Sequence, residues 1–362
     1  MKDTFRILAI NPGSTSTKIS VFENEREISA IKLSHSVEEL DPFEKIVDQY
    51  EFRRDVIVSE LRKAGYDVSS FDAVVGRGGV LYPVEGGTYE VNDLMLEHVR
   101  KGVQGEHQSN LGALIAESFS REAGCPAYIV DPVVVDEMQP IARFSGLPHL
   151  PRRSILHALN QKAVARKACL DSGIDYEKAR LIVSHLGGGI SAGAHVDGRI
   201  IDVNNALNGD GPFSPERSGG LPAGDLINLC FSGRYTHDQI KKLNKGAGGM
   251  VAYLGTNDVR EVRARMRSGD AEAGIVFEAM AYQVSKEIAS LSAVLEGRID
   301  LIVLTGGIAF DEEFTALVRK RVGFLAPVRV YPGEMEMEAL ALGGLRVLRG
   351  QEQPKVYNPK MS

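Results

Sequence analysis

The sequence predicts an α/β protein built from two domains of like topology, and three observations support this. The chain has 362 residues, more than one hydrophobic core usually serves. Short runs rich in Ile and Val alternate with stretches of helical periodicity, which is typical of mixed sheets covered by helices. One strand-and-turn pattern occurs twice, close to residue 6 and again close to residue 180.

Short apolar runs predict the strands, because each is rich in β-branched residues and ends at glycine or a polar turn. They are Arg6–Ile10, Ile19–Phe22, Ala73–Gly76, Ala127–Val130, Leu181–Ser184 and Leu301–Thr305. Apolar residues at helical spacing predict the helices between them. The main ones are Pro42–Lys63, Ser109–Ala123 with Ser109 as its cap, Arg152–Leu170 and Ala271–Leu295.

The repeated pattern consists of an apolar strand, a polar residue, a tight glycine-containing turn and a return strand. Aligning Ile7 with Leu181 places Asn11 on His185. In the second copy, the return strand is expected near Ala192–Val196. We therefore expect two duplicated domains that face each other, each with one phosphate loop at the cleft.

Composition limits the compartment and the partners. The formal net charge of −6 argues against nucleic-acid and anionic-membrane partners, because both need a basic face. No run approaches the roughly 18 apolar residues of a membrane span, and the N-terminus lacks a secretory apolar region. The cysteines Cys125, Cys169 and Cys230 are odd in number and far apart, which argues against disulfides and for a reducing cytoplasm. An anionic substrate must then be bound by a few cations and by backbone amides.

The first candidate phosphate loop is Asn11–Lys18. It matches neither the P-loop nor the dinucleotide-binding pattern. Its backbone N–H groups and hydroxyls, with a lysine at its edge, suit a polyphosphate. A hydroxyl-rich hairpin without a ligand is an equally good interpretation. The candidate binding residues are Asn11, Gly13, Ser14, Thr15, Ser16 and Lys18.

Two more glycine-rich loops follow predicted strands. In the second loop, His185–Ser191, the consecutive glycines Gly187, Gly188 and Gly189 favour a backbone that lies flat against phosphates. The third loop, Thr305–Ala309, precedes an acidic helix start and suits the ribose and base of a nucleotide. A plain strand-to-helix turn is an equal alternative for it. The candidate residues of the third loop are Thr305, Gly306, Gly307 and Ile308.

Together the loops resemble those of the acetate and sugar kinase, Hsp70 and actin superfamily. Within it the sequence is similar to the acetate kinase family of carboxylate kinases, and most similar to its butyrate kinase branch. The segments that carry the resemblance are Asn11–Lys18, Val75–Gly79, Val130–Pro132, Arg152–His157, Val183–Ser191 and Leu304–Ile308. The resemblance implies two duplicated ribonuclease-H-like domains, residues 1–150 with 340–362 and residues 151–339, and an interdomain ATP cleft. It also implies at least a homodimer formed through the second domain.

The resemblance also implies roles for single residues. Asn11 matches an asparagine near Mg²⁺ and phosphate, and Arg77 matches the arginine that binds the substrate carboxylate. The glycines beside Arg77 leave little side-chain bulk around it, which suits a ligand. His107 falls where the family has a histidine lining the site. Asp131 matches an essential aspartate, and His185 matches the histidine that contacts the transferred phosphoryl group.

The sequence departs from the family pattern in two places. The second site arginine of acetate kinases is missing from Gly220–Asp225, and Arg217 just upstream is the candidate replacement. The late glutamate linked to Mg²⁺ maps onto an acidic run. Glu338 fits the apolar spacing best, and Glu334 and Glu336 remain alternatives.

The expected reaction is direct in-line transfer of the γ-phosphoryl group of ATP to butanoate, giving butanoyl phosphate and ADP. The carboxylate is ionised at neutral pH, so no general base is needed. Arg77 would bind it through two parallel donors. His185, Arg217 and Mg²⁺ would stabilise the phosphoryl charge, with Asp131 holding metal waters or the histidine–arginine cluster.

Three other interpretations stay open. A branched-chain or acetate and propionate kinase is the alternative within the class, because one buried methylene contributes only about 0.8 kcal/mol. A non-catalytic actin-like or Hsp70-like nucleotide sensor is the alternative outside it. The basic stretch Arg260–Arg267 is predicted to be a solvated helix face rather than an anion site.

Overall fold

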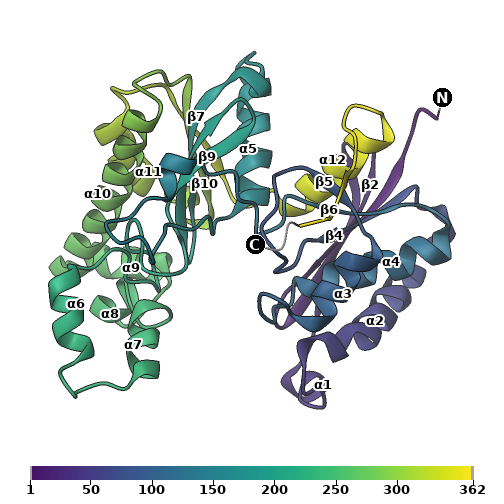
Figure 1. Ribbon diagram of the computed structural model, residues 1–362, viewed down its shortest axis with the longest axis horizontal. Coiled ribbons are helices and arrows are strands. Elements are labelled where there is room, and N and C mark those ends of the chain that lie inside the picture. Colours follow the sequence, from purple (N-terminus) through teal and green to yellow (C-terminus); the bar gives the residue numbers. More distant parts are fainter. Residues whose placement is uncertain (1, 360–362) are drawn as a thin grey trace. The chain divides into compact units, whose positions relative to one another are not determined.

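The computed structural model describes residues 2–359, and its contacts divide the chain into two compact units (Figure 1). The first unit comprises Met1–Asp136 and Met335–Ser362, and the second comprises Glu137–Glu334. No helix among the described residues is long and apolar enough to cross a membrane.

The first unit is built on a mixed sheet with the strand order β12-β5-β6-β4-β1-β2-β3. Its strands are β1 (Arg6–Pro12), β2 (Ser16–Glu23), β3 (Arg26–Ser34), β4 (Ala73–Arg77), β5 (Thr88–Glu90), β6 (Ala127–Val130) and β12 (Lys355–Val356). Strands β1, β2 and β3 form an antiparallel meander, and β4 lies parallel to both β1 and β6. The carboxyl ends of β1, β4 and β6 therefore meet at one edge of the sheet.

Helices cover both faces of this sheet (Figure 1). They are α1 (Val37–Leu40), α2 (Tyr50–Lys63), α3 (Asp93–Lys101), α4 (Asn110–Ala123) and α12 (Glu336–Leu348). A Cβ on Gly76 of β4 would lie 2.1 Å from the Gly112 oxygen of α4, while Gly344 of α12 faces the Val75 side chain. Because neighbouring strand residues point to opposite faces, α4 and α12 pack on opposite sides of β4.

The second unit repeats this plan. Its sheet has the order β11-β10-β7-β8-β9, in which β7, β8 and β9 form an antiparallel meander and β10 lies parallel to β7 and β11. The strands are β7 (Arg180–Leu186), β8 (Ile190–Val196), β9 (Arg199–Val203), β10 (Leu301–Gly306) and β11 (Val328–Pro332). The first unit's strands β6-β4-β1-β2-β3 have the same order and directions. The predicted duplication and the α/β fold class are confirmed.

Helices of the second unit surround its sheet. They are α5 (Ala158–Asp171), α6 (Ala223–Cys230), α7 (His237–Asn244), α8 (Met250–Leu254), α9 (Val259–Arg267), α10 (Ala271–Val294) and α11 (Glu312–Val322). Ile182 and Leu186 of β7 join the hydrophobic core with α10. Successive strand residues point to opposite faces, so His185 points away from this core. It faces the side of the sheet that α5 covers.

Short 3₁₀ turns connect several of these elements. They are Ile46–Gln49, Val68–Ser70, Pro140–Arg143, Tyr176–Lys178 and Gly307–Phe310.

The expected helices differ from the observed ones at their N-terminal ends. The helix predicted from Pro42 begins only at Tyr50, after the Ile46–Gln49 turn. The helix predicted from Arg152 begins at Ala158, because the Arg152 guanidinium instead bonds Asp202 (2.9 Å) and holds this segment beside β9. Apolar spacing alone does not distinguish a helix from an extended segment that a tertiary ion pair fixes.

The boundaries between the compact units lie after Asp136 and after Glu334, whereas the sequence placed them at 150 and 340. Glu137 belongs with the second unit, because its carboxylate bonds the Lys162 ammonium (3.0 Å) and the Ile200 N–H (2.8 Å). Glu336 belongs with the first, because it bonds the Asn11 side chain (2.7 Å).

Candidate active site

The first loop, Asn11–Lys18, is the turn between β1 and β2. The Gly13 N–H donates to the Ser16 carbonyl at 2.7 Å and closes the turn. Ser14 and Thr15 are exposed at its tip, as is the Lys18 side chain at the start of β2. The loop therefore presents hydroxyls and a cation to solvent at the carboxyl end of β1.

Glu336 connects two predicted site residues of the first unit. One carboxylate oxygen accepts from the Asn11 amide at 2.7 Å, and the other forms an ion pair with Arg77 Nη1. Asn11 ends β1 and Arg77 ends β4, so the two strand ends and the start of α12 meet here. Of the three glutamates considered from the sequence, Glu336 is the one these contacts join to Asn11. Glu338 lies half-buried two residues further along α12.

The glycines after Arg77 serve packing. A Cβ on Gly78 would lie 2.5 Å from Pro132 Cβ, and one on Gly79 would lie 2.5 Å from Asn110 Oδ1. Both positions exclude any larger residue for that reason. Close packing, and not room for a ligand, therefore explains why Gly78 and Gly79 are glycines.

Asp131 directly follows β6 and has a strained backbone conformation. Its φ is +38°, which is rare for a residue with a side chain, and its side chain is buried. Its Oδ1 accepts the Gly87 N–H at 2.7 Å. His107 lies exposed in the loop before α4, and its Nδ1 bonds the Ser109 hydroxyl at 2.8 Å. Ser109 therefore does not cap α4 with its side chain, contrary to the expectation.

In the second unit, His185 is buried at the end of β7. Its Nδ1 accepts from the Asn160 amide at 2.9 Å, and that amide also reaches Thr305 Oγ1 at 3.3 Å. With Nδ1 as an acceptor, the imidazole proton lies on Nε2. Nε2 is 3.6 Å from a carboxylate oxygen of Glu334.

A second histidine, His157, stacks on His185. The ring centroids are 3.8 Å apart and the ring planes differ by 10°. His157 Nδ1 is 2.9 Å from the Ser191 hydroxyl, which itself accepts from the Gln161 amide at 2.8 Å. The same hydroxyl accepts from the His157 backbone N–H at 3.5 Å, so both of its lone pairs are used, its hydrogen points to Nδ1, and this imidazole also carries its proton on Nε2. The pair supplies two N–H donors at the second loop, and two cationic rings this close would repel each other.

Arg217 lies against the second loop. A Cβ on Gly189 would be 1.6 Å from Arg217 Nη1, so only glycine lets the guanidinium pass there. Nη1 donates to the Ala206 carbonyl at 2.5 Å, while Nε is buried without a hydrogen bond among the described residues. Burial lowers the pKa of this guanidinium. The structure thus brings Arg217 together with the triple-glycine turn.

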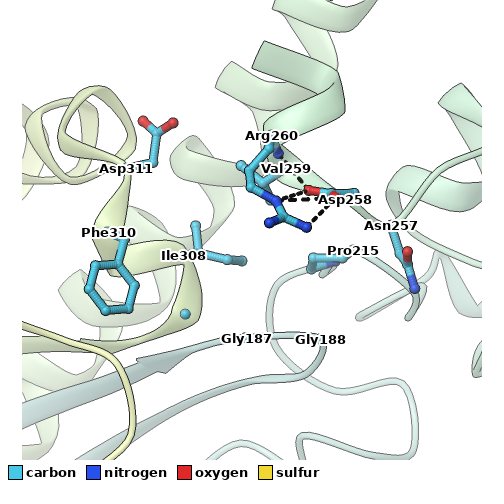
Figure 2. A pocket seen from close by; sticks show the side chains of 11 residues that line it. Gly187, Gly188, Pro215, Asn257, Asp258, Val259, Arg260, Ile308, Phe310 and Asp311 are labelled. Carbon is cyan, nitrogen blue, oxygen red and sulfur yellow. Dashed lines mark hydrogen bonds and ion pairs between the residues drawn. The ribbon is translucent and has the colours of Figure 1, made fainter. Parts of the chain in front are cut away.

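The second and third loops line one cavity of about 680 Å³, a size typical of small-molecule sites. Figure 2 shows Gly187 and Gly188 below Arg260 and Ile308 in the view chosen. The full lining consists of Gly187, Gly188, Pro215, Asn257, Asp258, Val259, Arg260, Gly307, Ile308, Phe310 and Asp311. Its walls combine apolar side chains with backbone and charge, as a nucleotide requires.

The close approach of the two loops depends on Gly306. Its φ is +93°, and a Cβ there would lie 2.4 Å from the Leu186 carbonyl oxygen. The Thr305 hydroxyl is buried and donates to the Gly333 carbonyl at 3.1 Å. Thr305 and Gly306 therefore hold the third loop against β7, and Gly307 and Ile308 reach the cavity.

Arg260 opens the basic stretch Arg260–Arg267 and its side chain is 91% exposed, as expected for a solvated helix face. Its side chain lines the cavity, where it bonds both carboxylate oxygens of Asp258 (Figure 2). The Arg260 guanidinium lowers the pKa of Asp258 to about 2. Arg263 and Arg265 instead form ion pairs with Asp311 and Asp270.

A Mg²⁺ ion would find hard oxygen ligands at Glu336 and Asn11. Mg²⁺ is usually bound by one or two carboxylates together with substrate phosphates and waters. No group of three or more metal-ligating side chains occurs among residues 2–359. The donor set therefore fits an ion that arrives with a polyphosphate, rather than a closed protein cage.

Several site residues were not predicted. His157 and Asn160 frame the start of α5, and Asp258 and Phe310 line the cavity. The segment containing His157 had been singled out, but no role followed from it. The helix expected over Arg152–Leu170 placed His157 inside it, so no local signal marked this residue.

The fold of the chain is similar to that of solved acetate and propionate kinases. An acetate kinase from Porphyromonas gingivalis has a TM-score of 0.78 at 19% identity, over 95% of this chain and 100% of that one. A propionate kinase from Francisella tularensis subsp. tularensis SCHU S4 has a TM-score of 0.70 at 20% identity, over 94% and 98%. The fold is that of the duplicated-domain kinases.

Sequence comparison gives the family. Residues 146–340 match the model of the acetokinase family. The chain is 57% identical to butyrate kinase 2 of Clostridium acetobutylicum over 98% of this chain and 99% of that protein. It is 53% identical to butyrate kinase 1 of the same organism, with the same coverage. The chain belongs to the acetokinase family, and the expected enzyme class of carboxylate kinases is confirmed.

Proposed function

We propose that this enzyme converts butanoate and ATP to butanoyl phosphate and ADP. The observation that carries the proposal is the single cavity lined by both Gly187–Gly188 and Gly307–Ile308, with Arg217 and His185 beside the same glycine turn. Similarity to two butyrate kinases over nearly the full chain supports the substrate.

The nucleotide is proposed to bind with its base between Ile308 and Arg260 and its phosphates along the glycines of the second loop. A guanidinium plane stacks on purines, and Ile308 supplies an apolar surface. Successive N–H groups of a glycine turn suit phosphate oxygens. The first loop, Asn11–Lys18, is proposed to bind phosphate as well.

Arg77 is proposed to bind the substrate carboxylate through its planar pair of donors. Its pairing with Glu336 orients the guanidinium at the end of β4. The substrate carboxylate is already ionised at neutral pH and attacks the γ-phosphorus directly. Transfer then breaks the bond to the β-phosphate oxygen, and ADP leaves.

Phosphoryl transfer needs charge neutralisation more than covalent help. The Nε2–H groups of His185 and His157 and the guanidinium of Arg217 are proposed to stabilise the oxygens of the transferred group. Mg²⁺ would be held by Glu336 and Asn11 and would offset phosphate charge. Asp131 is proposed to bind metal waters or a cationic neighbour, and His107 to line the carboxylate side.

The assembly is proposed to be at least a homodimer formed through the second unit. Helix α6 has no buried residue, although Ile227 and its flanks Leu221 and Phe231 are apolar. Their exposed fractions are 58%, 46% and 87%. An apolar surface of this kind favours burial against another protein surface. The location is proposed to be a reducing cytoplasm, in which Cys125, Cys169 and Cys230 would stay free thiols.

The test is a hydroxamate assay for acyl phosphate with ATP, Mg²⁺ and carboxylates from C2 to C5, including isobutyrate. We expect butanoate to give the highest kcat/KM, with isobutyrate close to it. A higher kcat/KM for acetate or propionate would instead assign that acid as the substrate. ATP binding without any acyl phosphate would instead favour a nucleotide sensor.

A further inference from the structure

The first loop lies over a buried cation that the mechanism above does not use. Arg53 of α2 is fully buried, with 0% of its surface exposed. Its guanidinium bonds Gly13 O (2.8 Å), Ser14 O (2.9 Å), Ser16 O (3.1 Å), Thr17 Oγ1 (3.0 Å) and Gln49 Oε1 (2.8 Å). Three of these acceptors are consecutive or near-consecutive carbonyls of the loop.

The Arg53 guanidinium has only neutral partners within residues 2–359: all its hydrogen-bond acceptors there are uncharged, and no carboxylate lies within ion-pair distance. Burial lowers its pKa to about 10, so the guanidinium stays charged at neutral pH. Buried charges are normally paired, because an uncompensated one is costly. A buried cation without a carboxylate partner, directly beneath a loop of exposed residues, therefore attracts an anion that binds to this loop from outside the protein.

The hydrogen bonds to Arg53 also orient the loop. In a trans peptide the C=O and the following N–H point in opposite directions. Because the carbonyls of Gly13 and Ser14 point inward to Arg53, the N–H groups of Ser14 and Thr15 point away from it. Neither N–H has a hydrogen-bond acceptor within the described residues, and both residues are exposed. Two unpaired amides above a buried cation form an anion-binding turn.

We infer that Arg53 is a positioning residue for nucleotide phosphate: it turns the first loop's N–H groups outward and supplies the positive charge beneath them. The inference rests on the proposed function, because it takes the first loop to bind the phosphates of ATP. Arg53 itself touches no substrate. The group that Arg53 serves is a polyphosphate, which adenosine lacks.

The test compares ligands that share adenosine and differ in phosphate. Affinities of Mg·ADP and of adenosine are measured by calorimetry for the parent, Arg53→Met, Arg53→Lys and the matched control Arg54→Met. Arg54 is the next residue of α2 and bonds Ser118 and Glu122, away from the loop. Its substitution removes the same charge from the same helix.

For Arg53→Met we expect Mg·ADP binding to weaken about ten-fold to a hundred-fold, the range of a lost charge-assisted interaction, with adenosine affinity unchanged. KM for ATP should rise while KM for the carboxylate stays constant. Arg53→Lys should fall between parent and Arg53→Met, because it keeps the charge but cannot reach every acceptor. Arg54→Met should bind both ligands like the parent.

Parental Mg·ADP affinity in Arg53→Met, or equal weakening of Mg·ADP and adenosine, would overturn the inference. If Arg53→Met does not fold, Arg53→Lys decides: parental Mg·ADP affinity there overturns it, and selective weakening supports it. The parent's own hydroxamate assay is independent of these variants. Absence of acyl phosphate from the parent would refute the proposed reaction while leaving the ADP and adenosine comparison valid.

Discussion

Substituting Gly189 with alanine should displace the Arg217 guanidinium, although Arg217 itself is unchanged. The new Cβ would lie 1.6 Å from Nη1, 2.5 Å from Cζ and 3.1 Å from Nη2 of Arg217. Side-chain carbons do not approach other heavy atoms closer than 3.0 Å, so the guanidinium must move by more than about 1 Å. That movement breaks its 2.5 Å hydrogen bond to the Ala206 carbonyl. Arg217 would then leave its position beside the glycine turn.

The size of the effect follows from the role proposed for Arg217. Losing one preorganised donor to a developing charge costs about 10²–10³ in kcat. The atoms displaced are the end of a flexible side chain, so the free energy of unfolding should change by less than about 1 kcal/mol. We therefore expect Gly189→Ala to lose activity and keep its Tm.

The assay is the initial rate of hydroxamate formation at saturating ATP and butanoate, measured for Gly189→Ala, Arg217→Ala and the double variant. If the alanine acts through Arg217, the double variant should have the kcat of Arg217→Ala alone. A kcat of Gly189→Ala within a few-fold of the parent would refute the reasoning. So would losses that multiply in the double variant, because they would show two independent effects.

Three further substitutions test other parts of the site and the fold. Arg77→Lys keeps the charge but loses the planar fork. The transition-state stabilisation calculated from kcat/KM for butanoate should therefore fall by about 2–4 kcal/mol, with ATP affinity unchanged. Near-parental activity would mean that another residue binds the carboxylate. Ser191→Ala removes the donor to His157 Nδ1, so kcat for hydroxamate formation should fall, and a parental kcat would contradict the tautomer assignment. Burial raises the pKa of Glu287 from 4.5 to about 7, so its ionisation destabilises the fold progressively from about pH 4.5 to 7. Glu287→Gln should therefore raise Tm by several degrees at pH 8 and only a little at pH 5. An equal rise in Tm at both pH values would show that ionisation of Glu287 does not destabilise the fold.

The strands could be predicted because their residues are buried on both faces. Ile7–Ile10 and Leu181–Val183 are apolar at successive positions and almost fully buried, so a single sequence shows them directly. Helix starts were less accurate. Arg152 sits in an apolar-periodic stretch yet forms a tertiary ion pair with Asp202, which sequence periodicity does not contain.

Site residues were predictable where they lie on loops with unusual composition, and not where they depend on packing. The glycines of the second loop predicted a special backbone at residues 187–189. Stacking of His157 on His185 joins residues from α5 and β7, and no local pattern encodes such a contact. The choice of Glu336 over Glu338 likewise depends on which of the two reaches Asn11 and Arg77 at the start of α12.

The duplication also relates the end of β4 in the first unit to the end of β10 in the second. Ile7 pairs with Ala73 of β4, and Leu181, its equivalent, pairs with Leu301 of β10. Extending both registers along the parallel strands makes Arg77-Gly-Gly equivalent to Thr305-Gly-Gly. The two strand ends have diverged in use: in the first unit Gly78 and Gly79 are closed by packing, whereas Gly307 has nothing within 4 Å and lines the cavity. The repeated strand end therefore carries Arg77, the proposed carboxylate ligand, in the first unit, and an open backbone at Gly307, beside the proposed nucleotide site, in the second.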